Sequence, residues 1–308
     1  MPTLAHLPPA AAGDMAFRIF CTPELSHHRT SDHHRLTERA RFHLRHARWE
    51  RVATPVGEVC AYVFEPDQDR RGTVLLVHGW TSEAAFMTAF VEPLRRSGLR
   101  VVAFDFPAHG HSPGRRTNLS QCARAMLAVA EQFGPIDAAV AHSFGGFVSL
   151  LVAEGGSPLP RAHRIGRFVL LACPNHLGEV TRNFGGQLDL SREAQRAYEH
   201  HLERVGHRPV ATFSAVELLG KASVPALILH GCEDREVPFR NAEEIAGACP
   251  TARLVPFEGF GHRTILYAPP VMRAVTRELA PLPIQDDVVS PRRRSKRAST
   301  GREMNASA

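Results

Sequence analysis

Residues 138–153 read AAVAHSFGGFVSLLVA and place Ser143 where a short apolar run meets a helix-prone one. The apolar start, Ala138 to Val140, predicts a buried strand, and the end predicts a helix. A serine in such a sharp turn takes a strained backbone conformation and holds its hydroxyl clear of the sheet. Its neighbours at two residues before and after must be small, and Ala141 and Gly145 meet that requirement. We therefore predict a nucleophile at Ser143, with an ordinary strand-to-helix turn as the alternative.

Apolar segments alternate with helical segments on both sides of this turn. The pattern predicts an α/β fold with a mainly parallel sheet covered by helices on both faces. Before it, Trp49 to Ala53 and Glu58 to Phe64 flank a Pro-Val-Gly turn and predict a hairpin. Ligands of such sheets bind at the carboxyl ends of the strands. The later predicted strands are 74–77, 101–104, 138–140, 168–172, 226–229 and 254–257.

Two further side chains complete a possible catalytic set with Ser143. A serine hydroxyl needs a histidine base, and the histidine needs an acid that holds its tautomer. Asp234 lies in GCEDREVP at 231–238, and His262 ends EGFGH at 258–262, each after a predicted strand. Taken alone, Asp234 is typical of a turn carboxylate and His262 of a surface histidine. In the order Ser, Asp, His they predict a triad, with Glu233 as the alternative acid.

These motifs, in this order, resemble the α/β-hydrolase fold superfamily. The resemblance covers about residues 49–279 and implies an α/β-hydrolase fold in which Ser143, Asp234 and His262 are the catalytic residues. The chain departs from the usual pattern at Ala141, where glycine is commoner. The triad implies a serine hydrolase of carboxylic esters that works through an acyl-enzyme without metal or cofactor.

The resemblance also extends to the loop after the strand at 74–77. His78-Gly79-Trp80 is similar to the family's His-Gly-x loop, which implies that the backbone N–H groups of Trp80 and Phe144 form an oxyanion hole. The turn DFPAHGHS at 105–112 is a second family-like loop, and we expect it to be structural.

Three regions are expected along the chain. Residues 1–47 read as a polar leader with one helix, 48–280 as the hydrolase domain, and 281–308 as a basic disordered tail. The alternation breaks at 175–223, which predicts a small helical cap with an apolar pocket beneath it. The candidate substrate-binding residues are His142, Phe184, Leu188 and Tyr198.

Composition excludes several other classes of protein. The chain has 308 residues and a net charge of +6, but the tail alone carries six basic and three acidic residues, so no nucleic-acid partner is expected. No apolar run approaches the roughly eighteen residues of a membrane span. The six cysteines are scattered, which favours a reducing cytoplasm over a disulfide or zinc scaffold. The pairs His27-His28 and His33-His34 lack the spacing of a metal site.

Other readings of the same residues remain open. Lyases and acyltransferases can use the same triad, so the fold alone does not separate them from a hydrolase. A non-catalytic protein that binds or senses a small ligand is the alternative from another class. The expected partner is a small-molecule ester or acyl compound, and the oligomeric state does not follow from the sequence.

Overall fold

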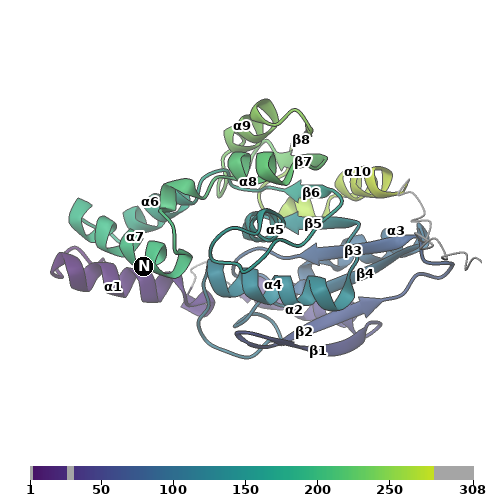
Figure 1. The fold of residues 1–308 in the computed structure, drawn as a ribbon, viewed down its shortest axis with the longest axis horizontal. Coiled ribbons are helices and arrows are strands. Elements are labelled where there is room, and N and C mark those ends of the chain that lie inside the picture. The colour runs from purple at the N-terminus through teal and green to yellow at the C-terminus, as the bar shows by residue number, and fades with distance from the viewer. Residues whose placement is uncertain (1–2, 26–30, 281–308) are drawn as a thin grey trace, which may run out of the picture.

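The computed structural model describes residues 3–25 and 31–280, without the side chains of 31–36. At its centre is one eight-stranded sheet with the order β1-β2-β4-β3-β5-β6-β7-β8 (Figure 1). β2 is antiparallel to both β1 and β4, and all other neighbours are parallel. The predicted α/β architecture is thereby confirmed. The strands are β1 (Arg48–Thr54), β2 (Gly57–Phe64), β3 (Gly72–Val77), β4 (Leu99–Phe104), β5 (Ala138–His142), β6 (Phe168–Leu171), β7 (Ala226–Gly231) and β8 (Ala252–Phe257).

The predicted hairpin is the β1–β2 pair. Thr54 pairs with Gly57 across the turn, and Gly57 has a φ of 110°, a conformation that side chains with a Cβ rarely adopt. The glycine in the Pro-Val-Gly turn is therefore needed for the chain to reverse here.

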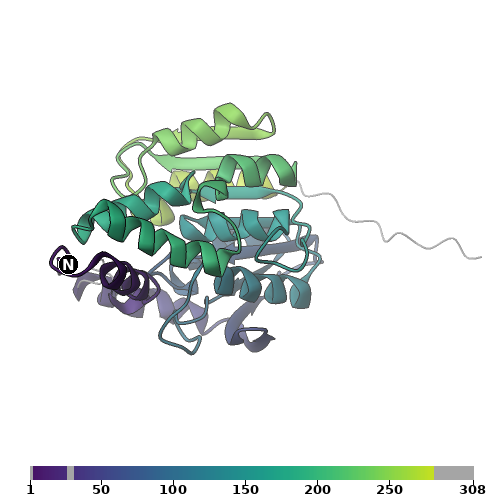
Figure 2. The same cartoon turned by 60° about the vertical axis from the view of Figure 1, so that its left-hand side comes forward.

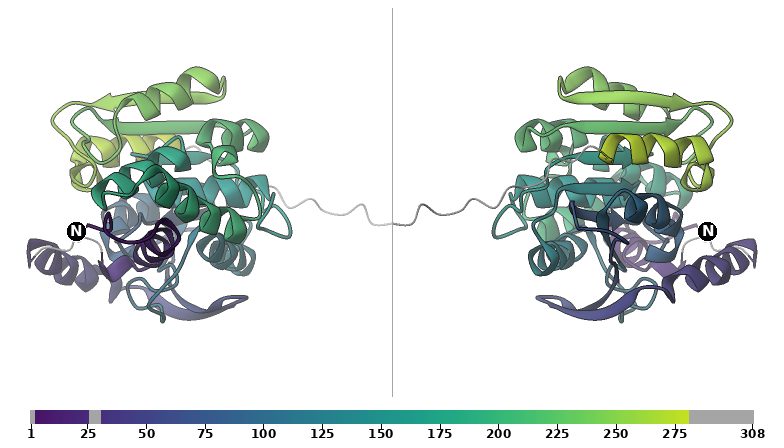
Figure 3. Two further views of the ribbon diagram at one scale, coloured as in Figure 1. Left: turned by 90° about the vertical axis from the view of Figure 1, so that its left-hand side faces the viewer. Right: turned by 90° about the vertical axis from the view of Figure 1, so that its right-hand side faces the viewer.

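Each parallel strand faces two separate apolar cores, because successive side chains in a strand point to opposite faces. In β3, Leu75 and Val77 belong to one core, whereas Val74 and Leu76 belong to the other. Helices α4, α5, α8 and α9 contribute to the first core, and α2, α3 and α10 lie with the second (Figure 3). These helices are α2 (Ser31–Leu44), α3 (Val91–Arg96), α4 (Leu119–Phe133), α5 (Phe144–Glu154), α8 (Ala215–Ala222), α9 (Arg240–Ala248) and α10 (Pro269–Leu279).

The chain between β6 and β7 contains the predicted helical insertion. It forms α6 (Leu177–Gln187), α7 (Arg192–Gly206), a short 3-10 helix (Val210–Thr212) and α8. Ser191 begins α7, because its hydroxyl accepts a hydrogen bond from the N–H of Ala194 at 3.2 Å. α8 packs against α5 and α9 beside the sheet, whereas α6 and α7 pack on each other at the side of the molecule where α1 lies (Figure 1).

The N-terminal region differs from its prediction as a polar leader with one helix. It contains two helices, α1 (Pro9–Phe20) and α2, and α1 lies alongside α7 (Figure 2). Small side chains allow this close packing, since a Cβ added at Gly13 would come within 2.6 Å of the Ala197 Cβ. Leu4 N–H also donates to the Leu188 carbonyl at 2.9 Å. Residues 3–20 are therefore part of the folded body.

Some expectations concern features beyond the described parts of the chain. The basic tail at 281–308 and the pair His27-His28 lie outside the described residues, as do the side chains of His33 and His34. Within residues 3–25 and 31–280, none of the helices has the length and apolar character needed to cross a bilayer. All six cysteines are free thiols, and only Cys232 is exposed.

Candidate active site

Ser143 stands at the turn between β5 and α5. Its φ of 52° and ψ of −122° lie outside the regions that residues with a side chain normally occupy. The turn is tight because α5 begins against the end of β3. A Cβ added at Gly145 would lie 2.4 Å from the carbonyl oxygen of His78, so no larger residue fits there. Ala141 is fully buried in β5. The strained serine between small neighbours is as the sequence predicted.

The structure brings together three side chains that are far apart in the sequence. His262 Nε2 lies 3.0 Å from Ser143 Oγ, and His262 Nδ1 lies 2.8 Å from Asp234 Oδ2. Ser143 follows β5, Asp234 follows β7, and His262 follows β8, so all three lie at the carboxyl ends of parallel strands. The imidazole can therefore take a proton from the hydroxyl while the carboxylate holds its other nitrogen.

Asp234 is held as a carboxylate by the turn in which it lies. Its Oδ1 accepts hydrogen bonds from the N–H groups of Glu236 at 2.9 Å and Val237 at 2.8 Å. Burial raises the pKa of Asp234, but the hydrogen bonds from His230 and His262 outweigh it and lower that pKa below its usual range. The alternative acid, Glu233, is exposed, so the structure favours Asp234.

His230 is a contributor to this site that the sequence did not predict. It is fully buried at the end of β7, and its Nε2–H lies 2.9 Å from the Val237 carbonyl oxygen and 3.3 Å from Asp234 Oδ2. It therefore lies against Oδ2 of Asp234, the same oxygen that contacts His262, and helps to hold that oxygen in position. The available signal is a histidine directly after a predicted strand and four residues before the acid.

The loop after β3 carries the predicted oxyanion donor Trp80. His78 accepts a hydrogen bond from Phe106 N–H at 3.0 Å and donates from Nδ1 to the Gly79 carbonyl at 2.8 Å. In a trans peptide the next N–H points away from that carbonyl, so His78 sets the direction of the Trp80 N–H. Among the described residues, the N–H groups of Trp80 and Phe144 donate to no other residue, which leaves both available to a ligand.

A model of the alpha/beta hydrolase family matches residues 74–275, about two thirds of the chain. The chain belongs to this family.

Its relatives include enzymes named for ester chemistry. A monoacylglycerol lipase of Mycolicibacterium smegmatis is 26% identical over 57% of this chain and 75% of that protein. A pimeloyl-[acyl-carrier protein] methyl ester esterase of Aromatoleum aromaticum is 28% identical over 65% of this chain and 94% of that protein. The structure of Est1E from Butyrivibrio proteoclasticus with ferulic acid is similar in fold, with a TM-score of 0.61 and 20% identity over 74% of this chain and 95% of that one.

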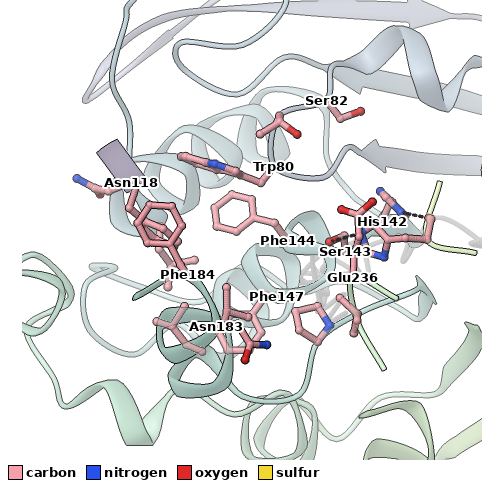
Figure 4. A pocket seen from close by; sticks show the side chains of 18 of the residues that line it. Trp80, Ser82, Asn118, His142, Ser143, Phe144, Phe147, Asn183, Phe184 and Glu236 are labelled. Carbon is pink, nitrogen blue, oxygen red and sulfur yellow. Dashed lines mark hydrogen bonds between the residues drawn. The ribbon is translucent and has the colours of Figure 1, made fainter. Parts of the chain in front are cut away.

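A cavity of about 540 Å³ opens beside Ser143 in this α/β hydrolase. Ser143 and His142 lie at one end and Phe184 at the other, with Trp80 and Phe144 between them (Figure 4). The lining is mainly apolar, which suits an uncharged organic group. Its apolar residues include Phe20, Phe147, Leu177, Val180, Leu202 and Phe213.

Two of the four predicted substrate-binding residues line this cavity and two do not. His142 and Phe184 are part of its surface. Leu188 and Tyr198 are fully buried and are not among the lining residues, so the prediction for them is wrong. Phe20 packs edge-to-face on Tyr198 at 5.6 Å and lies on the cavity side of it. Helix α1, which was not predicted, therefore takes the place expected for the cap residues.

The turn at 105–112 has the structural role expected of it. Buried Asp105 accepts hydrogen bonds from the Tyr62 hydroxyl at 2.6 Å and from the N–H groups of Ala84 and His111 at 2.8 Å each. Neither His109 nor His111 lines the cavity. The carboxylate thus joins β2, β4 and the segment after the Trp80 loop.

His142 connects the three loops of the site. Its Nε2–H donates to the His262 carbonyl at 2.8 Å, and a Cβ added at Gly79 would lie 2.8 Å from its Nδ1. Burial, and then the nearby His262, lower the pKa of His142 well below its usual value. Burial also lowers the pKa of His78, although Asp105 opposes that shift. Both imidazoles are therefore neutral at neutral pH.

We expect these two neutral histidines to make the folded protein acid-sensitive. The unfolded chain binds protons at the ordinary histidine pKa of about 6.5, whereas the folded chain does not, so stability is full above that pH and falls below it. The free energy of unfolding should drop as the pH falls below about 6.5, by up to about 1.4 kcal/mol per pH unit for each histidine. Urea unfolding over this range measures the slope.

Two variants separate His142 from the other histidines. His142→Gln keeps an N–H donor near the His262 carbonyl but removes the titrating group, so its slope should be shallower than that of the wild type. His200→Asn changes an exposed residue and should keep the wild-type slope. An unchanged slope in His142→Gln would contradict the assignment.

Proposed function

We propose that this α/β hydrolase is a serine esterase in which Ser143 attacks the carbonyl carbon of a carboxylic ester. His262 takes the hydroxyl proton and returns it to the departing alcohol as the carbon–oxygen bond breaks, and Asp234 stabilises the imidazolium. Water then hydrolyses the acyl-serine with the same base. The continuous contact from Ser143 to His262 at 3.0 Å and from His262 to Asp234 at 2.8 Å carries the proposal.

The backbone amides of Trp80 and Phe144 are assigned to the developing oxyanion. Phe144 N–H is the first in α5, where the helix dipole also favours negative charge. Trp80 N–H is oriented through the His78–Gly79 hydrogen bond. A donor of this kind contributes roughly 10²-fold to 10³-fold in rate.

The substrate class proposed is a small-molecule ester with an apolar acyl group. The cavity beside Ser143 is mainly apolar, and the two relatives named above are a lipase and a methyl ester esterase. A cytoplasmic location is part of the proposal, supported by six free thiols. We also propose that residues 175–223 contain the cap of the cavity, as the sequence predicts, and that α6 and α7 are the helices that cover it.

Substrate profiling and an active-site probe test this function. Matched p-nitrophenyl esters, thioesters and anilides should show ester hydrolysis as the fastest reaction. A fluorophosphonate should form one covalent adduct, at Ser143. A chain that binds esters without turning them over and without reacting with the probe would instead be a binding protein.

A further inference from the structure

One wall of the cavity comes from a segment outside the region that matches the family model. Ile19 and Phe20, at the end of α1, line the cavity together with Thr22 and with Leu25 of the following 3-10 helix (Pro23–Leu25). The family match begins only at residue 74. We call these four residues the N-terminal wall.

The N-terminal wall is held in place at several points. The Cys21 carbonyl accepts a hydrogen bond from Thr117 N–H at 2.8 Å, next to the start of α4. Ala12 and Ala16 are buried on the face of α1 that also carries Gly13, which meets α7 at Ala197. The wall therefore has a defined position over the cavity.

Phe20 connects this wall to both sides of the site. Its ring packs edge-to-face on Phe184 of α6 at 5.1 Å and lies nearly parallel to Trp80 at 6.1 Å. Trp80 is the residue whose N–H is assigned to the carbonyl oxygen of the substrate. Phe20 therefore lies next to the residue that is assigned to hold the carbonyl oxygen of the ester.

We propose that the N-terminal wall selects the acyl group, and that Phe20 limits the length and width of the acyl chain. The inference rests on the proposed function. Its physical basis is that the bulky ring of Phe20 occupies apolar space that a longer chain would fill. One methylene more or less in such a pocket changes selectivity by roughly tenfold or more.

Phe17 provides the matched control for Phe20. It lies one turn earlier on the same helix and stacks on His201 at 5.2 Å, but it does not line the cavity. Phe17→Ala thus removes the same side chain from α1 without changing the cavity surface. Phe20→Leu is a milder change in case Phe20→Ala does not fold.

The experiment measures kcat/KM of the full-length chain for p-nitrophenyl esters from acetyl to dodecanoyl. Phe20→Ala should raise the ratio of the longest to the shortest substrate by about tenfold or more over the wild type, and Phe20→Leu by less. Phe20→Trp should lower that ratio, and Phe17→Ala should keep it. Binding of saturated fatty acids of the same lengths to each variant gives a second readout that needs no turnover.

The outcomes separate this inference from the proposed function. A wild type that hydrolyses none of the esters contradicts the esterase proposal. In that case, the comparison of fatty-acid binding between the wild type and the Phe20 variants, as a function of chain length, tests whether the N-terminal wall selects the acyl group. A length profile unchanged in both Phe20→Ala and Phe20→Leu overturns the inference. An equal loss at all lengths also overturns it, because that result indicates a structural role only.

Discussion

Ser143→Ala is expected to lower kcat for ester hydrolysis by about a millionfold, since loss of the serine from such a triad removes the covalent route altogether. His262 then has no hydroxyl to deprotonate, although its contact with Asp234 at 2.8 Å does not depend on the serine. The residual rate should reflect only binding and the oxyanion donors. Labelling by a fluorophosphonate should vanish, while thermal unfolding should stay close to that of the wild type.

Ser82→Ala is the control for this change. Ser82 also lines the cavity, but it lies in the segment after Trp80, apart from Ser143 and His142 (Figure 4). The variant should keep its labelling and most of its activity. Persistent labelling of Ser143→Ala, or its loss in Ser82→Ala, would show that Ser143 is not the nucleophile.

Asp234→Asn should be the next most damaging change, with a loss of about 10⁴-fold in kcat. An asparagine can present an N–H to His262 Nδ1, which favours the tautomer that cannot accept the Ser143 proton at Nε2. The two N–H groups that now bond to the carboxylate, of Glu236 and Val237, can still reach an amide oxygen. The fold should therefore survive while KM changes little, as steady-state kinetics and thermal unfolding would reveal.

Glu233→Gln makes the same chemical change one residue earlier. Glu233 is exposed, and we expect this variant to keep nearly full activity. If Glu233→Gln lost activity and Asp234→Asn did not, the acid of the triad would be the neighbour of Asp234.

Most of the sheet could be predicted because its strands have a strong local signal. β3 to β7 are buried on both faces, so each reads as a continuous apolar run, and both the hairpin and the Ser143 turn have local residue requirements. The order of Ser143, Asp234 and His262 along a parallel sheet was enough to predict their proximity. The resemblance to the family favours Asp234 over Glu233, and the hydrogen bonds that Asp234 accepts in its turn support that choice.

Helix α1 could not be predicted in the same way. Its buried residues Ala12, Gly13 and Ala16 are small, and such a weak apolar pattern does not distinguish a packed helix from a polar leader. Their meaning depends on α7, which lies almost two hundred residues later in the chain. For the same reason, the sequence does not reveal that Phe20 and Phe184 both pack on Tyr198, or that Leu188 is buried where Leu4 meets it.

The amino-acid order alone specifies a parallel sheet, a strained serine and the acid and base that follow it, because each of these depends on neighbours close in the chain. The walls of the cavity depend on the tertiary structure. In the folded protein, α1 packs against α7 of the insertion after β6, and Phe20 lies beside Trp80. The reason is physical. A turn is governed by local backbone sterics, whereas the shape of a cavity is the space left between side chains from segments that meet only in the folded protein.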